Sequence, residues 1–572
     1  MLAFTPMDAA QRRQLLWFFA LALLVLGAGY GLRDPWPADE PRFVLVAKQM
    51  VDSGQWLFPH RGQELYPDKP PLYFWLLAAS HQLIGSWRWS FLLPSLLSGL
   101  GTLWLTYDLG RRLWNHRAGL WSAIAVLSAL QFDYQFKRAQ IDPTLVLCTT
   151  LAFYGLCRHL LLGPNWRWCW VGCFAAGIGV ILKGVGFLPL LALLPYALMR
   201  RQRWQGLAVL GDGNRRRWSL GALAFLAAIA LWLLPMAYFA LGSGDPEHRA
   251  YLDNLLFHQT ATRYTDAWQH RKPTWYFVEV ISLFWLPLSL AFPWLWRDWR
   301  DAWRARDARV WLPLAWAMLV VIFFSASPGK RDMYVLPALP AAALAAAPFL
   351  ATLVERRSFQ RALLGLCALL AGLLFGLGVC ALVSSPGFVQ RLVLERGLGI
   401  EMHWLWWMLV VVGATGLLAA LKFRAKGAPT AMAWLLVTMW CGYGFIAHPV
   451  LDPSSSASAL MLRARELAGP TTGIGLVEWK EQNLLQAVGP TAEFGFRQPA
   501  PEQLRRAVAW LDQDPAHRRV LLSQPRDQPS CFTSDPAAVT VVGTANRRDW
   551  YLVARSAISQ RCFGANLEDQ SP

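Results

Sequence analysis

The sequence predicts a polytopic α-helical membrane protein with about 13 transmembrane helices, followed by a small C-terminal α/β domain. Three observations lead to this prediction. More than half of the 572 residues are apolar (55%), only 16% are charged, and Trp is abundant at 32 residues. Apolar runs of about 20 residues recur up to position 449, each long enough to cross a bilayer core of roughly 30 Å as a helix. Beyond that position the chain becomes polar and is punctuated by Pro.

Thirteen segments of this kind follow one another along the chain. They lie near residues 14–32, 87–108, 118–134, 143–162, 168–182, 184–200, 218–241, 276–296, 309–326, 333–353, 360–384, 404–422 and 430–449. Because the segments are apolar on every face, lipid rather than water is their expected solvent. The first lacks a small-residue cleavage site and is interpreted as an anchor. The fifth and sixth are joined by Lys183 and Gly184 alone and are also compatible with a re-entrant pair.

The charge of the loops predicts the orientation. The Arg-rich loops lie at residues 11–14, 111–117, 200–217, 297–309, 355–357 and 422–426. Lys and Arg accumulate on the cytoplasmic side of membrane proteins, and thirteen spans place all of these loops on that side. We therefore expect a multi-pass protein of the bacterial inner membrane with a cytoplasmic N-terminus and a periplasmic C-terminal domain. The same bias explains the net charge of +18, so the charge does not indicate nucleic-acid binding.

The chain divides into a transmembrane domain over residues 1–449, with outer loops at 33–86 and 242–275, and a soluble domain over residues 450–572. The soluble part contains short apolar runs typical of strands at residues 473–477, 520–523, 538–542 and 550–554. Residues 501–510 predict an amphipathic helix with Pro in its first turn. Seven of the nine Cys lie in apolar spans, whereas Cys531 and Cys562 lie in the soluble part and are candidates for a disulfide in an oxidising periplasm.

The first outer loop carries the strongest chemical signal. Asp39 precedes residues 43–50, whose apolar side chains recur at helical spacing and predict a helix lying along the membrane surface. A carboxylate at a helix N-terminus is stabilised by free amides, so Asp39 is either a helix cap or a functional group. Further on, two prolines restrict the backbone and hold Asp68 and Lys69 at the mouth of the bundle. The alternative for that pair is a simple interfacial anchor.

These residues, in this order, resemble the GT-C membrane glycosyltransferases. The pair Asp39-Glu40 lies in the first outer loop, and Asp68-Lys69-Pro70-Pro71 follows before an aromatic apolar segment. More narrowly, the chain is similar to the bacterial branch that contains aminoarabinose–lipid A transferases and relatives of protein O-mannosyltransferases, and the resemblance covers the whole chain. It implies transfer of a sugar from a polyprenyl-phosphate donor in the membrane to lipid A, another envelope glycan or protein, at the periplasmic face.

The chemistry of that reaction suggests which cations take part. The leaving group is a lipid-linked phosphate, whose developing charge needs cations. The candidate phosphate-binding residues are Lys69, Lys183, Arg263, Lys330, Arg331 and Tyr334, which the predicted topology places on the outer side. Lys and Arg are unusual on the outer side of a membrane protein. The presence of Lys330 and Arg331 there therefore favours a functional role over an ordinary loop. Residues 331–337 also resemble the family's Lys/Arg-x-x-Tyr-x-x-Pro pattern, and Lys183-Gly184 resembles its Lys-Gly.

Asp39 and Glu40 are the candidate catalytic carboxylates. Asp39 is expected to act as the base for a hydroxyl acceptor or to orient the acceptor, since a phosphate acceptor is already nucleophilic and mainly needs positioning. The candidate supporting residues are Asp68, Asp142 and His270. Pro143 follows Asp142 at the start of a span, so an N-cap is an equal alternative for Asp142.

A metal site is suggested by the resemblance alone. Some members of the family hold a zinc ion with a His three residues before the Arg of the second outer loop and with the acidic residue before Lys-Pro-Pro. Here Thr260 stands three residues before Arg263, which leaves Asp68 and His258 as the candidate ligands. Two ligands, one of them Asp rather than the usual Glu, are too few for a zinc site, so no cofactor is assigned and a divalent metal stays open.

Two rival classes of protein share some of these features. A transporter or flippase of lipid-linked sugars would place ionisable groups near the bilayer midplane, and these spans are almost free of charge at their centres. A non-catalytic membrane scaffold would not need so many cations at one face. The sequence contains no nucleotide-binding loop, so direct use of a nucleotide sugar or ATP is unsupported.

Overall fold

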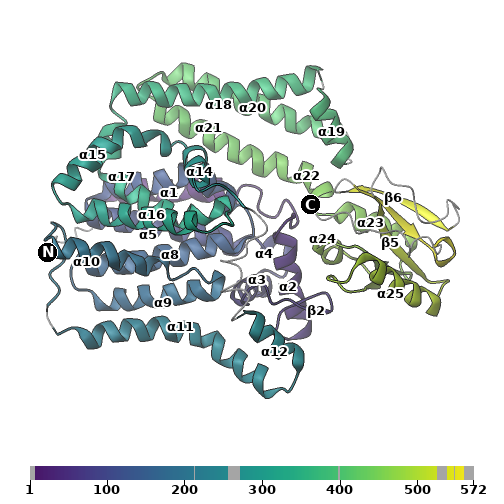
Figure 1. Ribbon diagram of the computed structural model, residues 1–572. Helices are drawn as coiled ribbons and strands as arrows, with labels where there is room; N and C mark the ends of the chain where they lie inside the picture. Colours follow the sequence, from purple (N-terminus) through teal and green to yellow (C-terminus); the bar gives the residue numbers. More distant parts are fainter. Residues whose placement is uncertain are drawn as a thin grey trace.

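The computed structural model describes residues 7–211, 213–255, 271–384, 386–396, 400–524, 538–545 and 548–558. Long helices lie side by side, and a β-sheet formed by the C-terminal part lies at one end of them (Figure 1). The short elements of the first outer loop lie between the helices and the sheet.

The helical part begins with α1 and ends with α22. In chain order it comprises α1 (Ala9–Gly27), α2 (Glu40–Ser53), α3 (Leu72–Ile84), α4 (Trp87–Ser90), α5 (Leu93–Leu113), α6 (His116–Ser128), α7 (Leu130–Phe136), α8 (Ile141–Leu160), α9 (Trp166–Lys183), η1 (Leu188–Ala192), α10 (Leu193–Arg201), α11 (Arg215–Gly242), α12 (Pro246–Asp253), α14 (Tyr276–Phe284), η3 (Ser289–Ala291), α15 (Phe292–Arg304), α16 (Ala308–Ala326), η4 (Asp332–Ala338), α17 (Leu339–Leu353), α18 (Arg357–Ser384), α19 (Gly387–Arg396), η5 (Ile400–Met402), α20 (His403–Phe423), α21 (Ala428–Gly442), η6 (Tyr443–Ala447) and α22 (His448–Ser455). A small hairpin, β1 (His60–Arg61) and β2 (Glu64–Leu65), lies in the first outer loop.

The polytopic helical fold predicted from the sequence is confirmed. Each of the thirteen apolar segments overlaps between one and three consecutive helices. In the described part of the chain, seven helices are by themselves long and apolar enough to cross a membrane, and α14 with α15, bent by 102°, would make an eighth span. Helices α5, α8 and α9 have 21, 20 and 18 residues, close to the length of a span, but carry charges toward their ends. Thirteen spans therefore stays a prediction.

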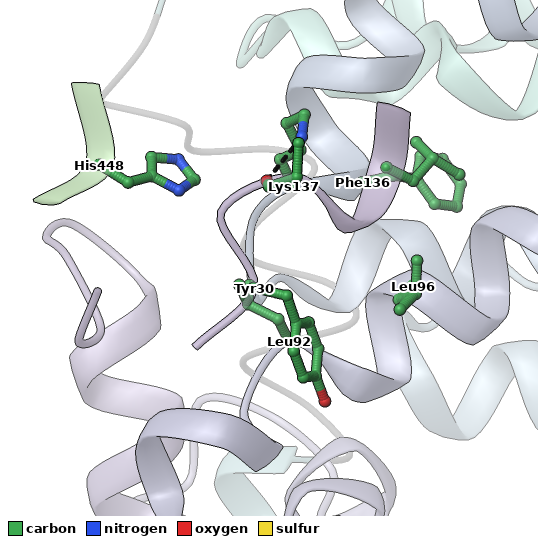
Figure 2. A pocket seen from close by; sticks show the side chains of 8 residues that line it. Tyr30, Leu92, Leu96, Phe136, Lys137 and His448 are labelled. Carbon is green, nitrogen blue, oxygen red and sulfur yellow. Dashed lines mark hydrogen bonds between the residues drawn. The ribbon is translucent and has the colours of Figure 1, made fainter. Parts of the chain in front are cut away.

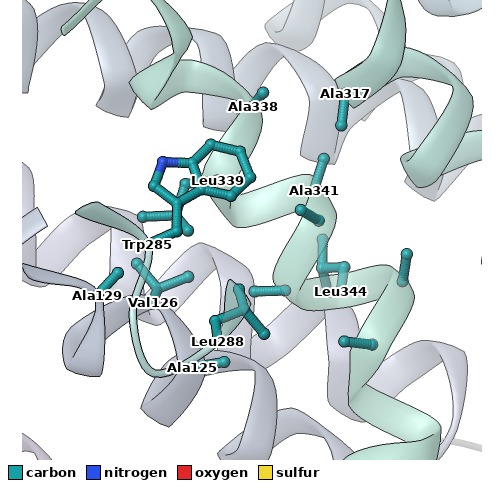
Figure 3. Close-up of a cluster of buried hydrophobic side chains, with 14 of the residues drawn as sticks. Ala125, Val126, Ala129, Trp285, Leu288, Ala317, Ala338, Leu339, Ala341 and Leu344 are labelled. Carbon is teal, nitrogen blue, oxygen red and sulfur yellow. The ribbon is translucent and has the colours of Figure 1, made fainter. Parts of the chain in front are cut away.

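Small side chains let the central helices approach closely. Helix α17 is rich in Ala, and Ala341 and Leu344 lie in a buried cluster with Val126 from α6 (Figure 3). Without a hydrophobic driving force between helices in lipid, such close contact is a main source of their association. Trp285 enters the same cluster, and its indole N–H donates a hydrogen bond to Gln131 Oε1 at 2.8 Å, so its polar atom is satisfied.

The C-terminal part folds as an α/β domain, as predicted. It comprises α23 (Ser458–Ala468), β3 (Gly473–Leu476), α24 (Glu481–Leu485), β4 (Thr491–Glu493), α25 (Ala500–Gln513), β5 (Arg518–Gln524), β6 (Val539–Ala545), β7 (Arg548–Val553) and η7 (Arg555–Ala557). The sheet order is β4-β3-β5-β7-β6, with β3 parallel to β4 and β5, and β7 antiparallel to β5 and β6. The four expected strands and the expected helix are present, and β4, three residues long, is an addition.

The two faces of this sheet pack against different partners. Successive strand residues point to opposite faces, and Val520 accordingly joins the core formed with α25, whereas Leu521 joins a core that contains α2 and α3. Helix α2 was expected to lie along the membrane surface. That position stays a prediction, but its apolar side chains, such as Val44 and Met50, are buried in this shared core and not left open to lipid. The helical run that ends in α22 continues to Ser455, beyond the domain boundary expected at residue 449.

Candidate active site

Five of the sequence-predicted site residues meet at the end of the helices that faces the sheet. Asp39 precedes α2, Asp142 lies in the first turn of α8, and Lys183 ends α9. Arg331 precedes η4 and Tyr334 lies within it. The described contacts link them into two ion pairs, Asp39 with Arg331 and Asp142 with Lys183, with Tyr334 beside the second pair.

Asp39 stands between two guanidinium groups. Its Oδ2 accepts a hydrogen bond from Arg331 at 3.2 Å, and Arg42 Nη1 lies 3.8 Å from its Oδ1. Asp39 occupies the N-cap position of α2, but its side chain makes no capping hydrogen bond, so the interpretation of this carboxylate as a helix cap is wrong. The side chain is 15% exposed, which leaves it reachable from outside.

Asp142 and Lys183 are brought together by the tight packing of α8 against α9. Gly155 and Gly172 lie at the contact, where a Cβ at either position would collide with the backbone of the other helix. The two helices therefore end side by side, and Lys183 Nζ donates to Asp142 Oδ1 at 2.5 Å. Gln140 holds the N-cap position and α8 begins at Ile141, so the N-cap alternative for Asp142 is wrong.

The segment that carries Arg331 is tied to α7. Gln131 donates a hydrogen bond to the Asp332 carbonyl at 2.7 Å, which anchors the start of η4. Lys183 Nζ lies 4.9 Å from the centre of the Tyr334 ring. Burial acts to lower the pKa of Arg331, but the carboxylates of Asp39 and Asp142 outweigh it and hold the pKa above its ordinary value. Arg331 is therefore a permanent cation between two carboxylates.

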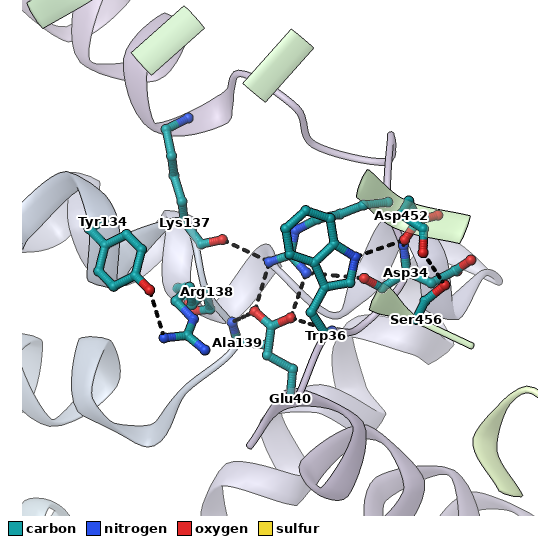
Figure 4. Close-up of polar contacts among 11 residues, drawn as sticks. Asp34, Trp36, Glu40, Tyr134, Lys137, Arg138, Ala139, Asp452 and Ser456 are labelled. Atoms are coloured by element: carbon teal, nitrogen blue, oxygen red, sulfur yellow. Dashed lines mark hydrogen bonds and ion pairs between the residues drawn. The ribbon is translucent and has the colours of Figure 1, made fainter. Parts of the chain in front are cut away.

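Glu40 is placed differently from its neighbour. It is buried, and its carboxylate receives two hydrogen bonds from Arg33, at 2.5 and 2.7 Å. The backbone N–H groups of Trp36 and Ala139 donate to it at 2.7 and 2.9 Å (Figure 4). Burial acts to raise the pKa of Glu40, but Arg33 outweighs it and holds the pKa below its ordinary value. This carboxylate joins α2 to the segment before α8, and the arrangement does not support the catalytic role expected for it.

Lys330 also departs from expectation. It is buried, and its ammonium donates to the carbonyl oxygens of Ser327 and Lys272 at 2.6 and 3.2 Å. These bonds hold its charge between its own loop and the segment before α14, whereas the adjacent Arg331 faces Asp39. Asp68 and Lys69 are half-buried just before α3, and the Asp68 carboxylate acts electrostatically on Arg61 and Tyr66.

Some predicted residues lie outside the described part of the chain. They are His258, Arg263 and His270 in the second outer loop, and the Cys531 and Cys562 candidates for a disulfide. Among the described residues, no group of three or more His, Cys, Asp or Glu side chains is placed to hold a metal ion.

Several residues that shape this region were not predicted from the sequence. Arg42 follows Asp39 by three positions, a helical spacing that could have indicated the contact. Arg33 precedes α2, so no helical spacing relates it to its partner Glu40. Glu481 carried no signal either, because it lies 439 positions from its partner Arg42. Pairings over such distances depend on the tertiary fold.

A cavity near the ends of α1 and α7 is too small for a substrate. Its volume is about 10 Å³, and Tyr30, Leu96, Phe136, Lys137 and His448 are among the residues that line it (Figure 2). Such a volume holds about one water molecule. Lys137 already donates to the Ala28 carbonyl at 2.9 Å.

Comparison with known proteins identifies the family. The family model described as dolichyl-phosphate-mannose-protein mannosyltransferase matches residues 68–234. An undecaprenyl phosphate-alpha-4-amino-4-deoxy-L-arabinose arabinosyl transferase of Pseudomonas aeruginosa is 30% identical over 442 residues, which are 74% of each chain. A transferase of the same description from Pseudomonas fluorescens is 31% identical over 445 residues, again 74% of each chain.

Solved structures share the fold. ArnT from Cupriavidus metallidurans in the apo state has a TM-score of 0.72 and 21% identity, with 96% of this chain and 100% of that chain covered. The same protein bound to undecaprenyl phosphate has a TM-score of 0.70 and 20% identity, with coverage of 96% and 98%. None of these similarities supports the flippase alternative. This chain is a multi-pass membrane glycosyltransferase, and it belongs to the family of undecaprenyl phosphate-alpha-4-amino-4-deoxy-L-arabinose arabinosyl transferases.

Proposed function

We propose that the enzyme transfers 4-amino-4-deoxy-L-arabinose from undecaprenyl phosphate to lipid A, with Asp39 at the reacting centre. The relatives carry the donor in their names, and the sequence resemblance adds the acceptor. The observation that carries the proposal is the placement of Asp39 against Arg331, beside Lys183 and Tyr334. A carboxylate next to fixed cations, at a helix-bundle end, suits a reaction that expels a phosphate.

In this reaction the bond between the sugar C1 and the donor phosphate oxygen breaks, and a bond from C1 to an acceptor oxygen forms. The departing undecaprenyl phosphate gains one negative charge, which Arg331 and Lys183 are placed to stabilise. An acceptor phosphate is already ionised and needs no base. Asp39 would then orient the reactants, either by contacting the amino group of the donor sugar or through Arg331. An acceptor hydroxyl would give its proton to Asp39.

The proposed orientation follows from the loop charges. The Arg-rich loops 111–117, 200–217 and 297–309 join other helices on the side opposite to Asp142 and Lys183; the Ala208 N–H, for example, donates to the Leu160 carbonyl at the far end of α8. We place those loops in the cytoplasm and the candidate site, with the C-terminal domain, in the periplasm of the inner membrane. The boundary between the two domains is proposed near Ser455, where the last long helical run ends.

Mass spectrometry of lipid A tests this function. A deletion strain would be complemented with wild type, Asp39→Asn or Asp301→Asn. The last is a matched control, because Asp301 is 66% exposed near the end of α15 that is proposed to be cytoplasmic. Aminoarabinose should be restored by wild type and by the control but not by Asp39→Asn. Full restoration by Asp39→Asn would remove Asp39 from the mechanism. If the deletion strain accumulated lipid-linked sugar on the cytoplasmic side of the membrane, the protein would be a flippase instead.

A further inference from the structure

The C-terminal domain holds the first outer loop through buried or half-buried carboxylates. Just before this domain, Asp452 in α22 accepts hydrogen bonds from the Asp34 backbone N–H and the Trp36 indole, both at 2.9 Å. Glu493 accepts from the Gln63 backbone N–H at 2.7 Å. These contacts and the core shared with α2 make the domain and the loop one packed unit.

One of these carboxylates reaches the neighbourhood of Asp39. Glu481, the first residue of α24, is 5% exposed, and its Oε1 accepts hydrogen bonds from Arg42 Nε at 2.8 Å and from Arg61 Nη1 at 3.2 Å. A buried carboxylate needs partners, and the two guanidinium groups around Glu481 hold this one in place. Arg42 is held in turn, because its Nε edge is taken by Glu481.

The other end of Arg42 faces the candidate base. Arg42 Nη1 lies 3.8 Å from Asp39 Oδ1, which is too long for a hydrogen bond but close enough for a strong electrostatic effect. Arg331 contacts the other oxygen, Oδ2. Burial acts to lower the pKa of Arg42, but Glu481 outweighs it, so the pKa lies above its ordinary value and the guanidinium stays charged.

We propose that Glu481 is a positioning residue, through which the C-terminal domain completes the active site by holding Arg42 at a set distance from Asp39. The inference rests on the proposed role of Asp39 in transfer. With Glu481 in place, Arg42 meets Asp39 only as a long ion pair, in which Nη1 lies 3.8 Å from Oδ1. Without the Glu481 carboxylate, Arg42 is free to form a hydrogen-bonded salt bridge with Asp39. That salt bridge would make the Asp39 carboxylate unavailable to the acceptor.

The effect of losing Glu481 should appear in turnover rather than in donor binding. Arg331 and Lys183, which are placed to bind the donor phosphate, do not contact Glu481 in the described structure. Misplacement of a reacting group by about 1 Å can cost roughly a hundredfold in rate. We therefore expect Glu481→Gln to lower kcat by about 10- to 100-fold, with the KM for the donor within about twofold of wild type.

The matched control is Glu493→Gln. Glu493 also joins the domain to the loop, through Gln63, but it has no contact with Arg42 or Asp39 in the described residues. Purified wild type and both variants would be assayed in nanodiscs with undecaprenyl phosphate-linked aminoarabinose and lipid A. The proposal requires a loss of kcat in Glu481→Gln and nearly unchanged kcat in Glu493→Gln. Equal losses in both would reduce the effect to general docking of the domain and overturn the proposal, as would full activity of Glu481→Gln.

A double variant tests the route through Arg42. If Glu481 acts through that residue, Arg42→Gln combined with Glu481→Gln should have the kcat of Arg42→Gln alone. If the double variant instead had a loss of kcat equal to the product of the two single losses, the two residues would act independently, contrary to the proposal.

Hydrogen exchange separates this proposal from the proposed function. Amide exchange over residues 42–47 of α2, measured by mass spectrometry in nanodiscs, should quicken in Glu481→Gln but not in Glu493→Gln. If wild type transferred no sugar, the proposed function would fail, while quickened exchange in Glu481→Gln alone would still support the positioning of α2 by the domain. Unchanged exchange in Glu481→Gln would overturn the inference whatever the activity.

Discussion

The carboxylate of Asp39 lies 3.2 Å from the guanidinium of Arg331, although 292 positions separate the two residues in the chain. The pair joins the first outer loop to the segment before η4, and Lys183 and Tyr334 lie close by. A donor phosphate bound at this proposed site would meet a cation that is already paired with a carboxylate. Binding of the phosphate to Arg331 would loosen its pairing with Asp39 and make that carboxylate available to the acceptor.

Arg331→Lys tests whether the guanidinium is needed for the donor. Lys keeps the charge but loses the planar fork that binds two phosphate oxygens at once. We expect the KM for the donor to rise about tenfold, which corresponds to roughly 1.4 kcal/mol. The neighbouring Lys330→Gln is the control, because Lys330 donates to backbone carbonyls and should affect stability rather than donor KM. An increase in donor KM from Lys330→Gln alone would reverse this assignment.

The pair formed by Asp142 and Lys183 should separate stability from function. Their side chains are 8% and 16% exposed, so either single neutral variant leaves one poorly solvated charge without its partner. We expect Lys183→Met and Asp142→Asn each to lower the unfolding temperature. The double variant should lose about 1–3 kcal/mol less free energy of unfolding than the sum of the two single losses. Activity should stay low in the double variant, because the cation proposed to bind the donor phosphate is missing. Recovery of activity together with stability would make the pair purely structural.

Glu40→Gln should destabilise the protein. Its carboxylate is buried against Arg33, and removing one partner of a buried pair costs about 3–5 kcal/mol. Thermal unfolding in nanodiscs measures this loss. If the variant unfolded at the wild-type temperature and lost only kcat, Glu40 would regain the catalytic role that its burial argues against.

The same carboxylate should show its contribution in the pH dependence of stability. Because Arg33 holds the pKa of Glu40 below its ordinary value, the stabilisation is fully present above the ordinary Glu pKa of about 4.3. It is lost as the pH falls through the lowered pKa of the folded state. The difference in unfolding temperature between wild type and Glu40→Gln should therefore shrink at low pH, and a constant difference would point to a packing effect.

Gly155→Ala tests the helix contact that brings Asp142 to Lys183. A Cβ at Gly155 would collide with the Trp168 carbonyl oxygen, so α8 and α9 would have to separate. We expect a lower unfolding temperature and a higher donor KM. Gly365→Ala in α18 is the matched control, because open space surrounds that position and Ala should be neutral or stabilise by up to about 1 kcal/mol. Similar behaviour of the two variants would show that α8 and α9 tolerate a wider spacing.

The helical segments were predictable because each is a local signal. Twenty consecutive apolar residues specify a helix in lipid whatever the rest of the chain does, and the strands at 518–524 and 548–553 carry their own short apolar runs. Helix α2 was also found, but its surroundings were not. An amphipathic pattern shows that one face is apolar without showing whether lipid or a distant domain covers it.

Asp39 and Glu40 show where the sequence could not decide. Adjacent residues at the start of a helix point about 100° apart, so one carboxylate faces Arg331 and the other is buried on Arg33. The sequence by itself determined the helical membrane fold, the C-terminal α/β domain and the family resemblance, since these depend on runs of residues and their order. Only the tertiary structure decided which charges meet, because ion pairs such as Arg42 with Glu481 join residues far apart in the chain and depend on how whole helices pack.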